Sequence, residues 1–194
     1  EILLNKYASA LQGISTSDNP RFRSYFWEVE SIEISNWLQS TVENTVHYGG
    51  CESIVFLDKL IQLYESANEF VIDNDEFEKS RFASRDSGVY LRGKAAWIQK
   101  GIAVKQMGFL PVTLSQASPF DTNVAVILPE NDINLPAIWC YCSSSIYNEA
   151  VRQIDQKLNV TNATLVKVPF DLDYWSKVAE EDYPHGLPQP YSDD

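Results

Sequence analysis

Seven of the chain's 15 Lys and Arg residues lie within the 27 residues from Lys79 to Lys105, where Asp86 is the only acidic residue. The guanidinium of arginine is planar and can donate two parallel hydrogen bonds, either to the O6 and N7 edge of guanine or to a phosphate. Glycines punctuate the segment and allow close approach of the backbone to a ligand. The segment therefore predicts contacts with nucleic acid by Arg81, Arg85, Arg92 and Lys94.

The charge of the whole chain opposes this interpretation. The 194 residues include 27 Asp and Glu, and the formal net charge is −12 with a pI near 4.5. Nucleic acid is held first by neutralisation of its phosphates, so a uniformly acidic surface would exclude it. The charge is not uniform, however: the segment 79–105 carries +6 and the remainder −18. The alternative is that the basic segment forms a salt-bridged face with the acidic stretch 65–78.

No arrangement of residues in the sequence predicts catalysis. His47 and His185 lack the context of a general base, and no phosphate loop, nucleophile elbow or dinucleotide motif occurs. The three cysteines are too few for a disulfide framework and lack partners at metal-ligand spacing. We expect no catalytic residue, no metal and no bound cofactor, and thiols kept reduced in the cytoplasm. No run of 18 apolar residues predicts a membrane span.

Short strands and a few helices alternate irregularly, which is typical of an α+β fold. We expect short mixed or antiparallel strands with several helices packed on one side. Helices are predicted at 2–12, 54–64, 145–158 (capped by Ser144 or Ser145) and after Asp171, and strands at 22–29, 89–92, 95–99, 102–104, 123–128 and 164–168, with 53–57 as an alternative strand. Of the 24 aromatic residues, Phe26, Trp27, Trp97 and Trp139 are assigned to the core.

Three stretches of the sequence resemble one protein family. The segment Gly13-Ile-Ser-Thr-Ser-Asp-Asn-Pro-Arg-Phe22 is similar to the Gly-x-x-Thr-Gly-Asp-Asn-x-x-Phe motif of adenine-specific DNA methyltransferases of restriction-modification systems, with Ser17 in place of a glycine. The resemblance is to the single-chain, type IIG-like enzymes, in which the methylase and specificity regions are fused. The stretch from Trp97 to Pro111 and the stretch from Leu135 to Phe170 also resemble these proteins.

The resemblance implies a target recognition domain that binds double-stranded DNA. The Asn or Asp-Pro-Pro-aromatic motif of the methylase and its glycine-rich cofactor loop do not occur here. The absent methylase domain would bind S-adenosylmethionine, contact this region within one polypeptide, and transfer a methyl group to N6 of a flipped adenine. We expect this chain to be a fragment of such an enzyme, without catalysis or cofactor of its own.

The motif adds residues to the candidate site. Thr16 and Asn19 match it and are predicted to lie on the DNA side, Phe22 is predicted to be core, and the neighbouring Arg21 and Arg23 could reach phosphate. We expect residues 1–30 to form the connection from the methylase domain and a first strand, 31–170 the recognition core, and 171–194 a terminal helix with a Pro-rich exit. The alternative function is an acidic, aromatic-rich module that binds protein or carbohydrate.

Overall fold

The computed structural model describes residues 2–16, 18–30, 36–68 and 92–190. These residues form two antiparallel sheets and six α-helices, which confirms the α+β class. The larger sheet has the order β1-β7-β5-β6 and consists of β1 (Ala8–Gln12), β7 (Val124–Pro129), β5 (Gly101–Lys105) and β6 (Val112–Ser115). The smaller sheet has the order β2-β4-β3 and consists of β2 (Arg23–Tyr25), β4 (Ser53–Val55) and β3 (Asn36–Leu38).

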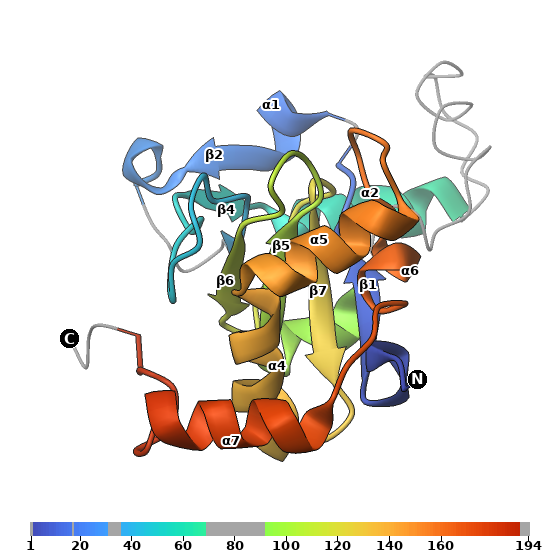
Figure 1. Cartoon of the computed structure of the whole chain (residues 1–194). Helices are drawn as coiled ribbons and strands as arrows, with labels where there is room; N and C mark the ends of the chain where they lie inside the picture. The colour runs from blue at the N-terminus through green and yellow to red at the C-terminus, as the bar shows by residue number, and fades with distance from the viewer. Residues whose placement is uncertain (1, 17, 31–35, 69–91, 191–194) are drawn as a thin grey trace.

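Alternation along the strands gives the larger sheet two apolar faces. Ile102 and Val104 of β5 join the main core, whereas Ala103 between them joins a second cluster on the other face. The main core is completed by four helices. In Figure 1, α4 (Leu135–Cys142) and α5 (Ser145–Ile154) lie in front of the sheet, α6 (Asn162–Leu165) lies beside β1, and α7 (Leu172–Asp182) crosses below the lower end. The 3-10 helix η4 (Lys94–Trp97) packs on the second face through Ala96 and Trp97.

A third apolar cluster joins the smaller sheet to α1 (Asn19–Phe22) and α2 (Leu57–Asn68). Phe22 is buried there, as predicted, together with Leu38, Val55 and Leu60. The sequence prediction for 53–64 offered a strand or a helix, and the chain forms both, because the strand ends at Val55 and the helix begins at Leu57.

The predicted strand 123–128 and the helix predicted after Asp171 are confirmed, whereas the helix predicted at 145–158 is confirmed only as far as Ile154, where α5 ends, and Leu158 is exposed. Ser144 caps α5 by accepting a hydrogen bond from the backbone N–H of Tyr147, and Asp171 caps α7 by accepting one from Tyr174. Each cap satisfies a backbone donor that the helix itself leaves unpaired.

Two predicted elements are wrong. Residues 2–12 form the 3-10 helix η1 (Leu4–Lys6) followed by β1, because pairing with β7 satisfies the backbone from Ala8 onward. Residues 164–168 do not form a strand. They begin within α6, and the carbonyls of Val166 and Val168 then accept hydrogen bonds from Asn5 and Leu4 while both valine side chains are buried.

One further strand prediction, 22–29, is only partly correct, and one more, 95–99, is wrong. The predicted strand 22–29 is reduced to the three residues of β2, which lie between α1 and the 3-10 helix η2 (Phe26–Glu28). Residues 95–97 lie in η4 instead of a strand, whereas 102–104 lie in β5 as predicted. The predicted strand 89–92 and most of the acidic stretch 65–78 fall outside the described residues. The division at residues 30 and 170 stays a prediction.

The described helices include none that is both long and apolar enough to cross a membrane.

Candidate functional site

Four connecting segments meet at one end of the larger sheet, which is the upper end in Figure 1. They are residues 13–16 after β1, 106–111 between β5 and β6, 120–123 before β7, and 155–161 after α5, and together we call them the loop end. Gln106 is buried among them: its side-chain amide donates to the Val160 carbonyl at 2.8 Å and its side-chain oxygen accepts from Gln12 at 3.1 Å. The loops are therefore held in one arrangement and not left independent.

The segment that carries the family resemblance enters this end under tight constraint. Ile14 donates its backbone N–H to the Phe120 carbonyl at 2.8 Å, and Gly13 lies so close to the same segment that a Cβ atom on it would be 2.0 Å from the Asp121 carbonyl oxygen. Position 13 therefore has no space for any side chain and requires glycine. Thr16 is buried, and its hydroxyl donates to the side-chain oxygen of Asn19 at 2.6 Å. Asn19 itself is exposed at the start of α1.

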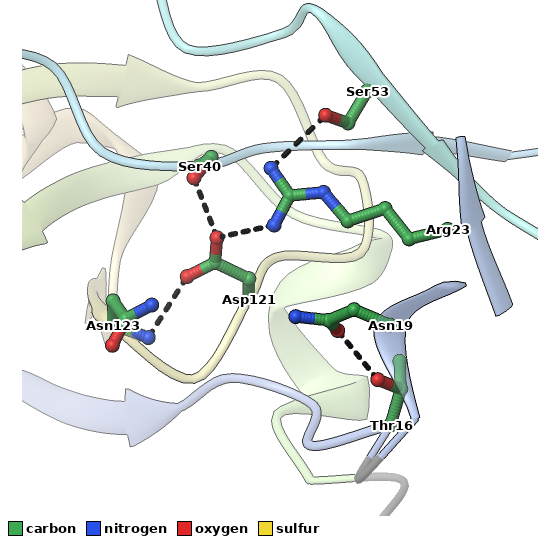
Figure 2. Close-up of polar contacts among 7 residues, drawn as sticks. All are labelled: Thr16, Asn19, Arg23, Ser40, Ser53, Asp121 and Asn123. Atoms are coloured by element: carbon green, nitrogen blue, oxygen red, sulfur yellow. Dashed lines mark hydrogen bonds and ion pairs between the residues drawn. The ribbon is translucent and has the colours of Figure 1, made fainter. Parts of the chain in front are cut away.

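Asp121 is the centre of a polar network beside this loop (Figure 2). One carboxylate oxygen pairs with the Arg23 guanidinium at 3.3 Å and accepts a hydrogen bond from the Ser40 hydroxyl, and the other accepts the backbone N–H of Asn123 at 2.8 Å. Arg23 also donates to the Ser53 hydroxyl at 3.0 Å. The network thus joins the smaller sheet, through Arg23 and Ser53, to the segment that leads into β7.

We call residues 13–16 together with Asn19 the motif loop. A pocket of about 230 Å³ opens between the motif loop and this network. Its walls carry hydroxyl, amide, carboxylate and guanidinium groups over a small apolar base, and they comprise Ile14, Ser15, Thr16, Asn19, Arg23, Leu38, Asp121, Thr122 and Asn123. Such a lining offers both hydrogen-bond donors and acceptors, which suits the edge of a nucleobase or another flat polar group.

The structure brings several of the predicted site residues together. Thr16, Asn19 and Arg23 all line the pocket. Arg21 is exposed on α1, with its guanidinium 5.3 Å from the Phe22 ring. Arg92 precedes Gly93, and a Cβ at Gly93 would lie 2.7 Å from the carbonyl oxygen of Gln12 and 2.6 Å from the Phe120 ring. The backbone next to Arg92 therefore lies against the start of the motif loop.

The remaining predicted residues are placed differently. Lys94 is exposed in η4. Arg81 and Arg85 fall outside the described residues. Arg23 is available to a phosphate only in competition with its bond to Asp121.

Asp121, Ser40 and Ser53 were not predicted as site residues. Asp121 is 98 positions from Arg23 along the chain, and Ser40 is 81 positions from Asp121, so no local spacing links them. The sequence Phe120-Asp-Thr-Asn123 signals a turn, but nothing in it shows which cation the carboxylate would meet.

The assignment of aromatic residues to the core is confirmed for Trp139 and wrong for Phe26 and Trp27. Trp27 is 59% exposed, and it stacks on Tyr25 with centroids 4.6 Å apart, while Phe26 contacts both Trp27 and Trp37. We call Tyr25, Phe26, Trp27 and Trp37 the aromatic patch. Two groups keep the nearby Glu28 ionised: the backbone N–H of Tyr25 and the Ser24 hydroxyl donate to its carboxylate and lower its pKa.

The described residues contain no group of three or more His, Cys, Asp and Glu side chains that could hold a metal ion. Cys51, Cys140 and Cys142 are free thiols. Burial raises the pKa of Cys142 and, with the charge of Asp182, raises the pKa of Cys140 to about 11. Both thiols therefore stay protonated at neutral pH, as structural cysteines do.

No protein-family model matches the chain, and the comparison with curated proteins gives no match either. The family of this chain is therefore proposed from its motifs and the site geometry.

Proposed function

We propose that this chain is the target recognition region of a DNA adenine-N6 methyltransferase of a restriction-modification system, acting in the cytoplasm. It binds double-stranded DNA at the loop end and reads the site, while the methylase domain of the same enzyme binds S-adenosylmethionine and methylates the adenine. The chain's own contribution is to bind and orient the duplex. The catalytic groups and the cofactor belong to the methylase domain.

The observation that carries this proposal is the placement of the motif loop. Asn19 is exposed beside a pocket of base-sized dimensions, while its neighbour Thr16 is buried and fixes the side-chain oxygen of Asn19. With its oxygen held by Thr16, the amide nitrogen of Asn19 points away from Thr16 toward the Asp121 side of the pocket (Figure 2). Asparagine amides pair with the N6 and N7 edge of adenine in the major groove, and such contacts require a side chain of fixed orientation.

The electrostatics of the pocket are compatible with a polyanion. Asp121 is the carboxylate nearest the motif loop among the pocket residues, and its charge is offset by Arg23 at 3.3 Å. Among the residues that line the pocket, the pair therefore leaves no carboxylate without a cationic partner. The acidic character of the chain as a whole is then a property of its other surfaces.

We expect Asn19→Ala to weaken binding of a duplex containing the recognition site by about 1 to 3 kcal/mol, because one base-edge contact is lost. Fluorescence anisotropy at low salt measures the affinity. The matched control is Asn5→Ala, since Asn5 is also exposed but lies in η1 at the opposite end of the sheet. Equal affinities of wild type, Asn19→Ala and Asn5→Ala for every duplex tested would remove Asn19 from the binding site.

The aromatic patch favours a second candidate function, a module that binds protein or carbohydrate. Its rings are exposed, and the neighbouring Glu28, Glu30 and Glu52 are exposed carboxylates. Aromatic faces beside carboxylates attract sugars or cationic side chains and repel phosphate. The two candidate functions therefore use different surfaces, and mapping of the bound surface separates them.

A further inference from the structure

The tip of the β5–β6 hairpin presents a phenylalanine to solvent at the loop end. The Phe109 side chain is 91% exposed, whereas Leu110 beside it is 2% exposed. Leu110 has φ of 52° and Gly108 has φ of 68°. The left-handed region costs a residue such as leucine about 1 to 2 kcal/mol, so the buried contacts of Leu110 must hold this turn in place. The turn directs Phe109 outward.

Side chains of α5 fix the backbone of the tip. The Asn148 amide donates to the Phe109 carbonyl, and Arg152 donates to the Gly108 carbonyl at 2.5 Å. A second nitrogen of Arg152 donates to the Lys157 carbonyl, so one guanidinium joins the hairpin tip to the segment after α5. The projecting ring therefore stands on a rigid base.

The segment paired with the hairpin tip carries an exposed apolar side chain and an exposed cation. Met107 forms a bridge with Asn159, and next to this bridge Leu158 is 71% exposed and Lys157 is exposed. The two segments form adjoining loops at the upper end of Figure 1, where α1 also lies. The apolar tip and the motif loop thus share one end of the molecule.

We propose that Phe109 is a wedge that inserts between stacked bases of the bound duplex. This inference rests on the proposed function and assigns a role to a residue outside the pocket. Proteins that kink DNA insert Phe, Leu, Ile or Met side chains at base steps and partly unstack them. A rigid tip suits this role because little side-chain or loop entropy is lost when it enters the stack. Lys157 is placed to contact a phosphate flanking the opened step.

The test uses the full chain and a duplex in which 2-aminopurine replaces one adenine at a time, since its fluorescence rises when it is unstacked. Wild type, Phe109→Ala and Phe109→Trp are compared at low salt. The matched control is Ile133→Ala, because Ile133 is 78% exposed in η5 (Asp132–Asn134), at the opposite end of the sheet. Thermal unfolding checks that all variants are folded, which the exposure of both positions leads us to expect.

We expect a fluorescence increase at one step with wild type and Phe109→Trp, and loss of this increase with Phe109→Ala. The same variant should bind roughly tenfold more weakly, as for loss of one stacked aromatic side chain, with an unchanged salt slope because no charge is removed. Ile133→Ala should match wild type. Binding by wild type with the same fluorescence for Phe109→Ala would overturn the wedge and leave the proposed function standing. Absence of DNA binding by wild type would overturn both.

Discussion

Replacing Asp121 by alanine should lower the free energy of unfolding by about 2 to 3 kcal/mol. The substitution removes the acceptor of three donors at once and leaves the Arg23 guanidinium without its ion-pair partner. Breaking a fully buried ion pair costs about 3 to 5 kcal/mol. The cost expected for Asp121→Ala is lower than this range because the Arg23 side chain is 25% exposed. Urea denaturation followed by circular dichroism measures the change as a shift of the midpoint.

The control is Glu43→Ala, which removes a second ion pair among the described residues, the one with Lys105 at 2.7 Å. Glu43 is 82% exposed, so its loss should change stability by no more than about 0.5 kcal/mol. If Asp121→Ala proves as mild as Glu43→Ala, the network in Figure 2 does not hold the two sheets together.

Gly13→Ala is expected to be similarly damaging and to lower the free energy of unfolding by about 3 kcal/mol. The added methyl group would clash with backbone atoms, which cannot move aside as a flexible side chain can. A methyl group at this position would lie 2.0 Å from the Asp121 carbonyl oxygen and 2.5 Å from the Phe120 carbonyl oxygen. The strand end and the segment before β7 would have to separate, which also displaces the motif loop. Urea denaturation gives the stability, and DNA binding of the folded fraction should fall with it.

Gly108→Ala separates this clash from the general effect of replacing glycine. Gly108 has φ of 68° and no atom within 4 Å of a Cβ position, so only the backbone preference is lost. That loss is about 1 kcal/mol. A Gly13→Ala variant no less stable than Gly108→Ala would show that β1 does not lie against the Asp121 segment as described.

Elements with a local signal were predictable from the sequence. The helices after Ser144 and Asp171 carry a capping side chain and an apolar stripe, and β7 is a continuous apolar run. Residues 2–12 have apolar residues at helical spacing, yet the pairing of Ala8–Gln12 with β7 decides their conformation. Such a pairing joins positions more than 100 residues apart, and no local pattern encodes it.

The residues of the candidate site likewise fall into those that a local sequence signal could predict and those that only the folded chain brings together. Thr16 and Asn19 could be named because they belong to one continuous motif, and Arg23 because it directly follows that motif. Asp121 and Ser40 could not, because only the folded chain brings them to Arg23. The exposure of Trp27 was missed because an aromatic residue in a short strand-like segment has no sequence feature that separates a core position from a surface position.

The most direct test of DNA recognition is an amide chemical-shift map of the chain titrated with a short duplex at low salt. We expect the largest changes at the loop end, at Ser15, Thr16, Phe109 and Lys157, and little change at the aromatic patch or in η1. The contradicting result has two parts. Duplex DNA would produce no chemical-shift changes, and an oligosaccharide or a basic peptide would produce changes confined to Tyr25, Phe26, Trp27 and Trp37.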